Sequence, residues 1–162
     1  MKQSPYQCVV VDDELLGREL IESHLDQLAQ FEVAGSCGSA IEAGELLSVT
    51  KVDLLFLDIQ MPVLNGTDFY KSLCDPPRVI FTTAYRDYAL DGFELEAVDY
   101  LLKPITFPRF FKAIDRFLAS QQSLGNGNIK SIDQSKDSLF IRANRKDVRL
   151  LLADIVYVQG LQ

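Results

Sequence analysis

Polar residues that could handle phosphate and metal ions stand where four short apolar segments end. They are Asp12, Asp13 and Glu14 after the first segment, Asp58 after the second, Thr82 and Thr83 at the third, and Lys103 with Pro104 after the fourth. In an open sheet of parallel strands, ligands bind beyond the carboxyl ends of the strands. If these segments are such strands, an acidic cluster, a hydroxyl and an ammonium group meet at one edge.

A cluster of acids of this kind needs a positive charge. Two carboxylates about 5 Å apart repel each other by roughly 3 kcal/mol at an effective dielectric near 20, so three of them shift their pKa values or hold a cation. Hard oxygen ligands without a nearby His or Cys favour Mg²⁺, with Mn²⁺ as the alternative. A carboxylate beside that ion can attack phosphorus and form an aspartyl phosphate. Lys103 would neutralise one phosphoryl oxygen, and a threonine hydroxyl would donate to another.

The segments that must position these residues alternate between strand and helix patterns. Strands are predicted over Gln7–Val11, Phe31–Gly35, Asp53–Leu57, Arg78–Thr82 and Asp99–Leu102. Helices are predicted over Leu16–Leu28, Ser39–Ser48, Gly66–Leu73, Asp87–Phe93 and Phe107–Leu118. Three of the strands are apolar on both faces, which is typical of parallel strands covered by helices on two sides. Right-handed crossovers then give an α/β fold with a five-stranded, parallel, doubly wound sheet.

The chain changes character after residue 122. Residues 1–122 carry a formal charge of −9 and residues 123–162 one of +2, within a total of −7. The polar, glycine-rich stretch Ser120–Asn128 indicates a linker. Strand patterns follow over Ser138–Ala143, Asp147–Leu152 and Ile155–Gln159, with no helix between them. Three short strands are marginal by themselves, so we expect them to pair along an open edge with the main sheet or with another chain.

Several classes of protein are disfavoured. The longest apolar runs fall far short of the ~20 residues that span a bilayer, and no basic-then-apolar signal peptide opens the chain. Three cysteines without a CxxC pair, together with a single histidine, argue against a disulfide scaffold and a cysteine–histidine zinc site. Neither a GxGxxG motif nor a phosphate-binding P-loop motif is present, which disfavours a nucleotide enzyme. We therefore expect a cytoplasmic protein with no membrane partner.

Taken together, the motifs resemble the receiver domain of two-component response regulators. The matching pieces are Val10–Glu14, Asp58–Pro62 followed by Gly66, Thr83-Ala84, and Asp99–Pro104. They occur in the family's order and with its spacing across roughly residues 5–122. Each motif alone is weak evidence for the family, but four motifs at the family's spacing are highly specific for it. The resemblance implies a flavodoxin-like (βα)5 fold.

The resemblance also implies how the acids act. Asp58 becomes the phosphoacceptor, Asp13 a direct Mg²⁺ ligand and Asp12 an assisting acid. Gln60 would offer its backbone carbonyl to the same ion. Asp12 and Asp13 by themselves could simply cap the helix that follows them, but the remaining motifs in register favour the metal site.

Other residues take roles on the phosphoryl group and in the switch. The resemblance gives Thr83 and Lys103 the task of holding that group, with Thr82 as the rival hydroxyl. Tyr100 becomes the aromatic whose rotamer follows Thr83, and the Lys103–Pro104 bond is the one that the family makes cis.

Later segments resemble one branch of this family. The pieces are Phe81–Tyr85 and Ala97–Tyr100, which are similar to receivers that precede a LytTR-type DNA-binding domain, and Ser138–Arg142 and Asp154–Leu161, which resemble the opening strands of that all-β domain. We therefore divide the chain into a receiver domain (1–122), a linker (123–137) and a truncated start of a LytTR-type domain (138–162). DNA is then a partner only through the missing C-terminal domain.

The function implied is a phosphorylation-controlled switch of a transcriptional regulator rather than an enzyme. A sensor histidine kinase phosphorylates Asp58 with Mg²⁺, and the chain itself performs at most self-phosphorylation from small donors and slow self-dephosphorylation. We expect a homodimer through the fourth helix, the fifth strand and the fifth helix. Two alternatives stay open: a Mg²⁺-dependent phosphohydrolase of similar topology, which needs a second acid where Gln60 stands, and a stand-alone receiver that acts by protein–protein contact.

Two further features have simple structural interpretations. His24 lies among polar neighbours on a predicted helix, so we expect it to be solvated rather than to donate a phosphoryl group. The basic residues of the tail strands, such as Arg142 and Arg149, suit phosphate contacts, but charged hairpins usually just solvate an exposed edge.

Overall fold

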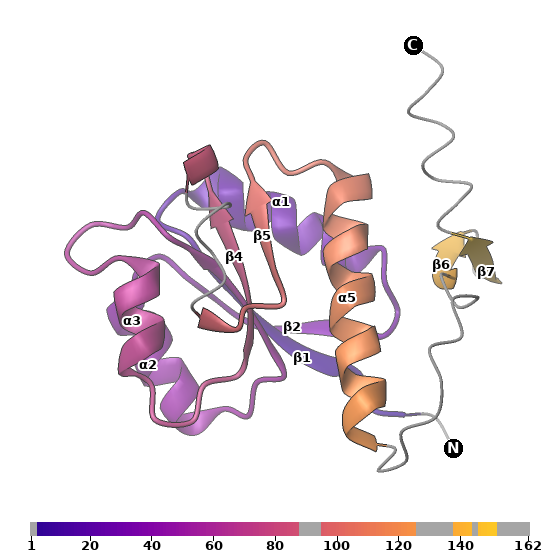
Figure 1. Ribbon diagram of the computed structural model, residues 1–162, viewed down its shortest axis with the longest axis horizontal. Helices are drawn as coiled ribbons and strands as arrows, with labels where there is room; N and C mark the ends of the chain where they lie inside the picture. The colour runs from indigo at the N-terminus through magenta and orange to yellow at the C-terminus, as the bar shows by residue number, and fades with distance from the viewer. Residues whose placement is uncertain (1–2, 88–94, 126–137, 144–145, 152–162) are drawn as a thin grey trace.

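A five-stranded parallel sheet lies between two layers of helices (Figure 1). The computed structural model describes residues 3–87, 95–125, 138–143 and 146–151. The strands of the main sheet are β1 (Tyr6–Val11), β2 (Phe31–Cys37), β3 (Leu54–Asp58), β4 (Arg78–Thr83) and β5 (Asp99–Leu102). Their order in the sheet is β2-β1-β3-β4-β5, which is the flavodoxin-like order. The predicted α/β fold class is confirmed.

Strands β3 and β4 each extend one residue further than the sequence pattern predicts. Asp58 and Thr83 therefore belong to the sheet itself, and Asp58 pairs in register with Thr82 of β4. Backbone pairing on a central strand fixes the direction of the Asp58 side chain.

Four helices lie in the described ranges given above. They are α1 (Leu15–Asp26), α2 (Ala40–Val49), α3 (Gly66–Ser72) and α5 (Phe107–Gly125). The helix predicted over Asp87–Phe93 lies outside the described residues except for Asp87. Helix α5 continues to Gly125, because no proline or glycine interrupts it earlier, so the first three residues of the predicted linker are helical.

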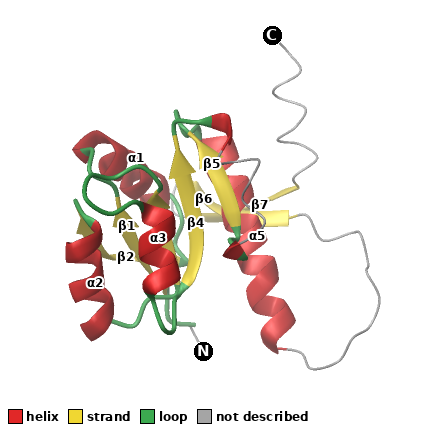
Figure 2. Cartoon of the chain, turned by 60° about the vertical axis from the view of Figure 1, so that its left-hand side comes forward, coloured by secondary structure: helices red, strands yellow, loops and turns green. Residues whose placement is uncertain are grey.

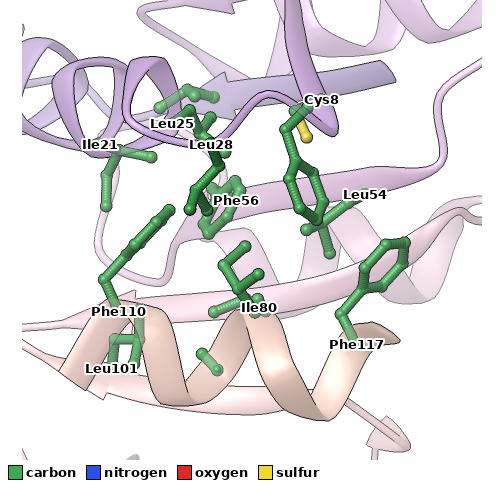
Figure 3. Packing of buried hydrophobic residues seen from close by; sticks show 14 of the residues in the cluster. Cys8, Ile21, Leu25, Leu28, Leu54, Phe56, Ile80, Leu101, Phe110 and Phe117 are labelled. Atoms are coloured by element: carbon green, nitrogen blue, oxygen red, sulfur yellow. The ribbon is translucent and has the colours of Figure 1, made fainter. Parts of the chain in front are cut away.

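Alternate residues of the strands pack into two hydrophobic cores, one on each face of the sheet. Helices α1 and α5 cover the face that carries Val10, Phe56 and Ile80, and α2 with α3 covers the opposite face (Figure 2). In the first core, Phe110 of α5 stacks on Phe56 of β3 (Figure 3), and Phe117 of α5 contacts the rings of Tyr6 of β1 and Phe31 of β2. Because both faces are buried, the middle residues of the central strands β1, β3 and β4 are apolar.

The tail strands form a separate hairpin. Strands β6 (Ser138–Ala143) and β7 (Lys146–Leu151) are antiparallel, and within the described part of the tail β6 pairs with β7 alone. The predicted pairing of the tail with the main sheet is therefore wrong for these strands, and pairing with another chain stays a prediction. Only two residues separate β6 from β7, so closing this loop costs little entropy. The third predicted strand, Ile155–Gln159, lies outside the described residues.

A buried acid fastens the edge strand β5 to α5. Asp99 is 7% exposed and accepts two hydrogen bonds from Arg109, at 2.8 and 2.9 Å. A third contact, at 2.8 Å, joins it to Arg116. Arg109 also donates to the carbonyl of Tyr100, at 3.1 Å, so the backbone of the edge strand is tied to the helix beside it.

We expect Asp99→Asn to lower the free energy of unfolding by about 1–2 kcal/mol, since a neutral amide cannot replace the two ion pairs. The loss is modest because both arginines are partly exposed, and solvent screens their charges. Urea unfolding measures it, with Asp26→Asn on the exposed side of α1 as the matched control. Equal stability of the two variants would contradict the assignment.

None of the helices in the described ranges combines the length and the apolar character needed to cross a membrane.

Candidate functional site

The carboxyl ends of four neighbouring strands bring the motif residues to one edge of the sheet. Asp12 and Asp13 follow β1, β3 ends on Asp58, β4 ends on Thr83, and Lys103 follows β5. These strands are consecutive in the sheet. The edge therefore gathers residues that are up to 91 positions apart in the sequence.

Three carboxylates form the centre of the site. One oxygen from each of Asp12, Asp13 and Asp58 lies within 4.8 Å of the others. Asp12 and Asp58 are buried, and Asp13 is exposed. A divalent ion that prefers oxygen ligands and keeps several waters fits this set, because the buried carboxylates supply charge while the exposed side leaves room for water.

The ammonium of Lys103 partly balances these acids. Its Nζ lies 2.8 Å from Asp12 Oδ2 and 3.5 Å from Asp58 Oδ2. Burial alone lowers the pKa of Lys103, but the hydrogen bond to Asp12 and the two carboxylate charges outweigh it, so the pKa lies above its ordinary value. Lys103 therefore stays charged at neutral pH, between the carboxylates of Asp12 and Asp58.

Asp58 is the acid that its surroundings perturb most clearly. Burial first, and the charge of Asp12 second, raise the pKa of Asp58 from 3.8 to about 7. The charge of Lys103 and a hydrogen bond from the backbone N–H of Gln60 act in the opposite direction. The carboxylate of Asp58 is thus poorly compensated without a further cation, and this is the electrostatic condition under which a divalent ion binds well.

The threonine at the end of β4 is buried beside this cluster. Thr83 Oγ1 accepts a hydrogen bond from the backbone N–H of Tyr85, at 3.0 Å, and so holds the start of the following loop. Thr82, the rival hydroxyl, is also buried and is the residue paired with Asp58. The preference for Thr83 stays a prediction.

Tyr100 lies half-buried on the same face as Phe81. The two rings stack with their centroids 5.2 Å apart, and Thr83 follows Phe81 by two positions on β4. Burial raises the pKa of the Tyr100 hydroxyl. An aromatic ring on the edge strand is thus joined through Phe81 to the strand that carries Thr83.

Comparison with known proteins shows what kind of domain carries this site. The sequence matches the family model of the response regulator receiver domain over residues 8–115. The chain belongs to the response regulator receiver family. Receiver domains are the phosphorylated components of two-component systems, they accept phosphate on an aspartate, and they generally bind Mg²⁺ at an acidic pocket.

Several relatives of this receiver are known. An uncharacterised response regulatory protein of Shewanella oneidensis is 43% identical over 112 residues, which cover 67% of this chain and 47% of that protein. The sensory transduction protein LytT of Bacillus anthracis is 34% identical over 157 residues, which cover 93% of this chain and 64% of LytT. The response regulatory domain of mrkE from Klebsiella pneumoniae superposes with a TM-score of 0.65 at 29% identity, over 72% of this chain and 98% of that domain. The chain thus spans less than two thirds of the length of these two curated relatives.

The structure of this receiver brings together most of the residues that the motifs singled out. Asp12, Asp13 and Asp58 lie together, Lys103 forms ion pairs with Asp12 and Asp58, and the Lys103–Pro104 bond is cis, as the resemblance implies. Gln60 contacts Asp58 through its backbone N–H, and the role of its carbonyl stays a prediction.

One prediction about the receiver is wrong. His24 is not simply solvated: it is partly buried, and its Nε2 lies 3.0 Å from the carbonyl oxygen of Ile105. The sequence contained a signal for this contact, because His24 follows the buried Ile21 by three residues, and residues three apart lie on the same face of a helix.

Gly66 is a second residue whose importance the motif alone does not explain. Its N–H donates to the carbonyl of Ile59 at 2.8 Å, which closes the loop after β3. A Cβ at this position would overlap the backbone carbonyl oxygen of Asp58. Glycine is therefore required for the first turn of α3 to approach the end of β3.

Proposed function

We propose that this receiver accepts a phosphoryl group on Asp58 and holds Mg²⁺ with Asp12, Asp13, Asp58 and the backbone carbonyl of Gln60. The observation that carries the proposal is the convergence of three carboxylates within 4.8 Å, with Lys103 bonded to two of them. Bound Mg²⁺ would neutralise charge on the transferring oxygens. Asp58 attacks the phosphorus of the kinase phosphohistidine as a carboxylate, and the bond from phosphorus to the imidazole nitrogen breaks with the imidazole as leaving group. Lys103 holds one phosphoryl oxygen, and Thr83 donates to another.

The test is uptake of one phosphoryl group. The full chain is incubated with acetyl phosphate and Mg²⁺ and its intact mass is measured. We expect the mass of one phosphoryl group on the wild-type chain and complete loss of that label in Asp58→Asn, because an amide is not a nucleophile. Asp53→Asn, at the opposite end of β3, serves as the control and should label normally. Equal labelling of Asp58→Asn would show that the acceptor is misassigned.

A sensor histidine kinase is the proposed donor. Three leucines on α1 leave the protein surface apolar close to the acids: Leu15, Leu16 and Leu20 are 57%, 78% and 38% exposed. A groove of about 190 Å³ is lined by Leu16 and Leu20 on one side and by Lys103 and Pro104 on the other. An exposed apolar patch beside the reactive carboxylate is suited to a protein partner rather than to a small substrate. This arrangement disfavours the alternative of a phosphohydrolase. Such an enzyme also needs a second acid two residues after Asp58, and this chain has Gln60 at that position.

We further propose that phosphorylation changes the face formed by the fourth helix, β5 and α5. The phosphoryl group adds about two negative charges, Thr83 moves toward it, and Tyr100 turns into the space that Thr83 leaves. Dimerisation through this face follows. The fourth helix lies mostly outside the described residues, so support comes from the stacking of Tyr100 on Phe81.

The dimer is tested with beryllofluoride, which mimics the phosphoryl group. We expect beryllofluoride with Mg²⁺ to raise the dimerisation constant of the wild-type chain, measured by analytical ultracentrifugation, by about fivefold or more, since a coupling free energy of 1–3 kcal/mol corresponds to such a factor. Asp58→Asn should not respond. A wild-type chain that binds beryllofluoride and stays monomeric would refute the dimer.

For the whole protein we propose a cytoplasmic transcriptional regulator with a receiver (1–122), a linker (123–137) and the start of a LytTR-type DNA-binding domain (138–162). The match to LytT extends through the tail, which supports this division. As part of this proposal, the chain is a substrate of its kinase rather than an enzyme in its own right, with self-phosphorylation from small donors and slow self-dephosphorylation as its only reactions. A stand-alone receiver that acts by protein–protein contact is the second candidate. Retardation of promoter DNA by residues 1–162 in a gel would contradict the proposal that these residues do not bind DNA by themselves.

A further inference from the structure

We infer that His24, the protein's only histidine, is a positioning residue that holds the loop carrying Lys103 in place for phosphoryl transfer. The Lys103 loop is defined as residues 103–106, between the end of β5 and the start of α5. The inference rests on the proposed phosphoacceptor role of Asp58. It concerns a residue that contacts neither the metal ligands nor the phosphoryl group.

A long-range hydrogen bond is the first observation. His24 Nε2 lies 3.0 Å from the carbonyl oxygen of Ile105, which is 81 positions further along the chain. A carbonyl only accepts, so Nε2 carries the proton and donates. Among the hydrogen bonds of the described residues, this is the one that joins α1 to the Lys103 loop.

Ring packing fixes the imidazole from a second side. His24 meets Phe107 edge-on at 5.4 Å and lies 5.2 Å from Phe110, both at the start of α5. Phe110 in turn stacks on Phe56 at 5.6 Å, and Figure 3 shows these two rings facing each other across the core. Phe56 precedes Asp58 by two residues on β3. The imidazole is therefore held by the helix and core that also support the phosphoacceptor strand.

The Lys103 loop is short and is anchored at both ends. The backbone N–H of Lys103 donates to the carbonyl of Thr83 at 2.7 Å, and the carbonyl of Ile105 accepts from His24. The Lys103 side chain extends from between these anchors to Asp12 and Asp58. With the loop free at Ile105, the ammonium could shift by a sizeable fraction of an ångström, and misplacement of about 1 Å at a reacting group is costly.

The groove beside the loop explains why this hydrogen bond matters. Leu16, Leu20 and Ile21 of α1 line one wall of the 190 Å³ groove, and Lys103, Pro104 and Ile105 line the other. Ile105 is buried in the same hydrophobic core as Ile21 of α1, but Lys103 and Pro104 border the open groove, so apolar packing holds only one end of the loop against α1. His24, one turn beyond Leu20, provides the missing connection.

The test compares two substitutions of His24 in the full chain. His24→Leu keeps an apolar side chain against Phe107 and Phe110 but cannot donate, whereas His24→Gln keeps an N–H donor. At saturating Mg²⁺ and acetyl phosphate, we expect His24→Leu to be phosphorylated about three- to tenfold more slowly, the range that one lost hydrogen bond gives, and His24→Gln to recover most of the rate. Ser23→Ala is the matched control, because the Ser23 hydroxyl bonds only within α1, to the carbonyl of Leu20.

Mg²⁺ affinity separates positioning from general destabilisation. The proposed ligands do not contact His24, so calorimetry should give the same Mg²⁺ dissociation constant for wild type and His24→Leu, within about twofold, while the phosphorylation rate differs. If His24→Leu is as fast as wild type, or if His24→Gln is as slow as His24→Leu, the inference is overturned. A wild-type chain that takes up no phosphoryl group at all overturns the proposed function, and this inference with it.

A second measurement needs no substitution at His24. The single imidazole gives one set of ring signals in an NMR spectrum, and we expect those signals to shift when beryllofluoride and Mg²⁺ draw Lys103 away from Asp12. The same addition to Asp58→Asn should leave them unchanged. Ring signals that stay in place in the wild-type chain, when beryllofluoride is bound, also overturn the inference.

Discussion

Asp58→Asn should make the protein more stable at pH 8 without Mg²⁺, by up to roughly 4 kcal/mol. The upper limit follows from the pKa of Asp58, which burial and then the charge of Asp12 raise from 3.8 to about 7. A carboxyl whose pKa is raised in the folded state stabilises that state fully below pH 4, and the contribution is lost as the pH rises to about 7. Asparagine has the shape of the neutral acid and carries no such loss.

Urea unfolding between pH 5.5 and pH 8.5 measures this effect. The stability difference between Asp58→Asn and the wild type should grow from pH 5.5 to about pH 7 and then level off. Mg²⁺ at about 100 times its dissociation constant should restore roughly 2.7 kcal/mol to the wild type and less to the variant, which lacks one ligand. The control is Asp26→Asn, at an exposed position on α1. If the stability difference between Asp58→Asn and the wild type does not depend on pH, the buried charge of Asp58 does not destabilise the folded protein.

Gly66→Ala should destabilise the protein by about 3 kcal/mol, since a new methyl group must displace backbone rather than a flexible side chain. The added Cβ would overlap the carbonyl oxygen of Asp58, and further contacts with the Asp58 carbonyl carbon and the Leu57 side chain lie at 3.0 and 3.1 Å. Relief requires α3 to move away from β3. The hydrogen bond from Gly66 N–H to Ile59 would then lengthen, and the loop that carries Gln60 would shift.

Gly44→Ala provides the matched control for this substitution. Gly44 lies inside α2, and a Cβ there meets only the ring edge of Phe69, at an ordinary 3.6 Å. Alanine in a helix interior is favoured over glycine by up to about 1 kcal/mol, so Gly44→Ala should be neutral or stabilising. Thermal unfolding and the rate of phosphorylation by acetyl phosphate should separate the two variants, with Gly66→Ala impaired in both. Equal behaviour of the two alanine variants would contradict the close approach of α3 to Asp58.

Local patterns were sufficient to predict the elements that bury both faces. The apolar runs of β1, β3 and β4 and the helical stripe of α1 each specify their own secondary structure within a short window. Element ends were less certain. Asp58 and Thr83 join the sheet because each pairs with a residue of the neighbouring strand, Asp58 with Thr82 and Thr83 with Leu102. Helix α5 runs to Gly125 because the polar residues before Gly125 do not prevent a helix.

The sequence by itself determined which groups could do the chemistry: three aspartates, a lysine and a threonine, each following a strand pattern. Only the tertiary structure decided their electrostatics, because the pKa of Asp58 depends on burial and on Asp12 and Lys103, which are 46 and 45 positions away. It also decided the place of His24, whose partner Ile105 lies across the groove between α1 and the Lys103 loop. Contacts between residues so far apart in the sequence depend on how the helices dock on the sheet, and this docking cannot be predicted from a short stretch of sequence.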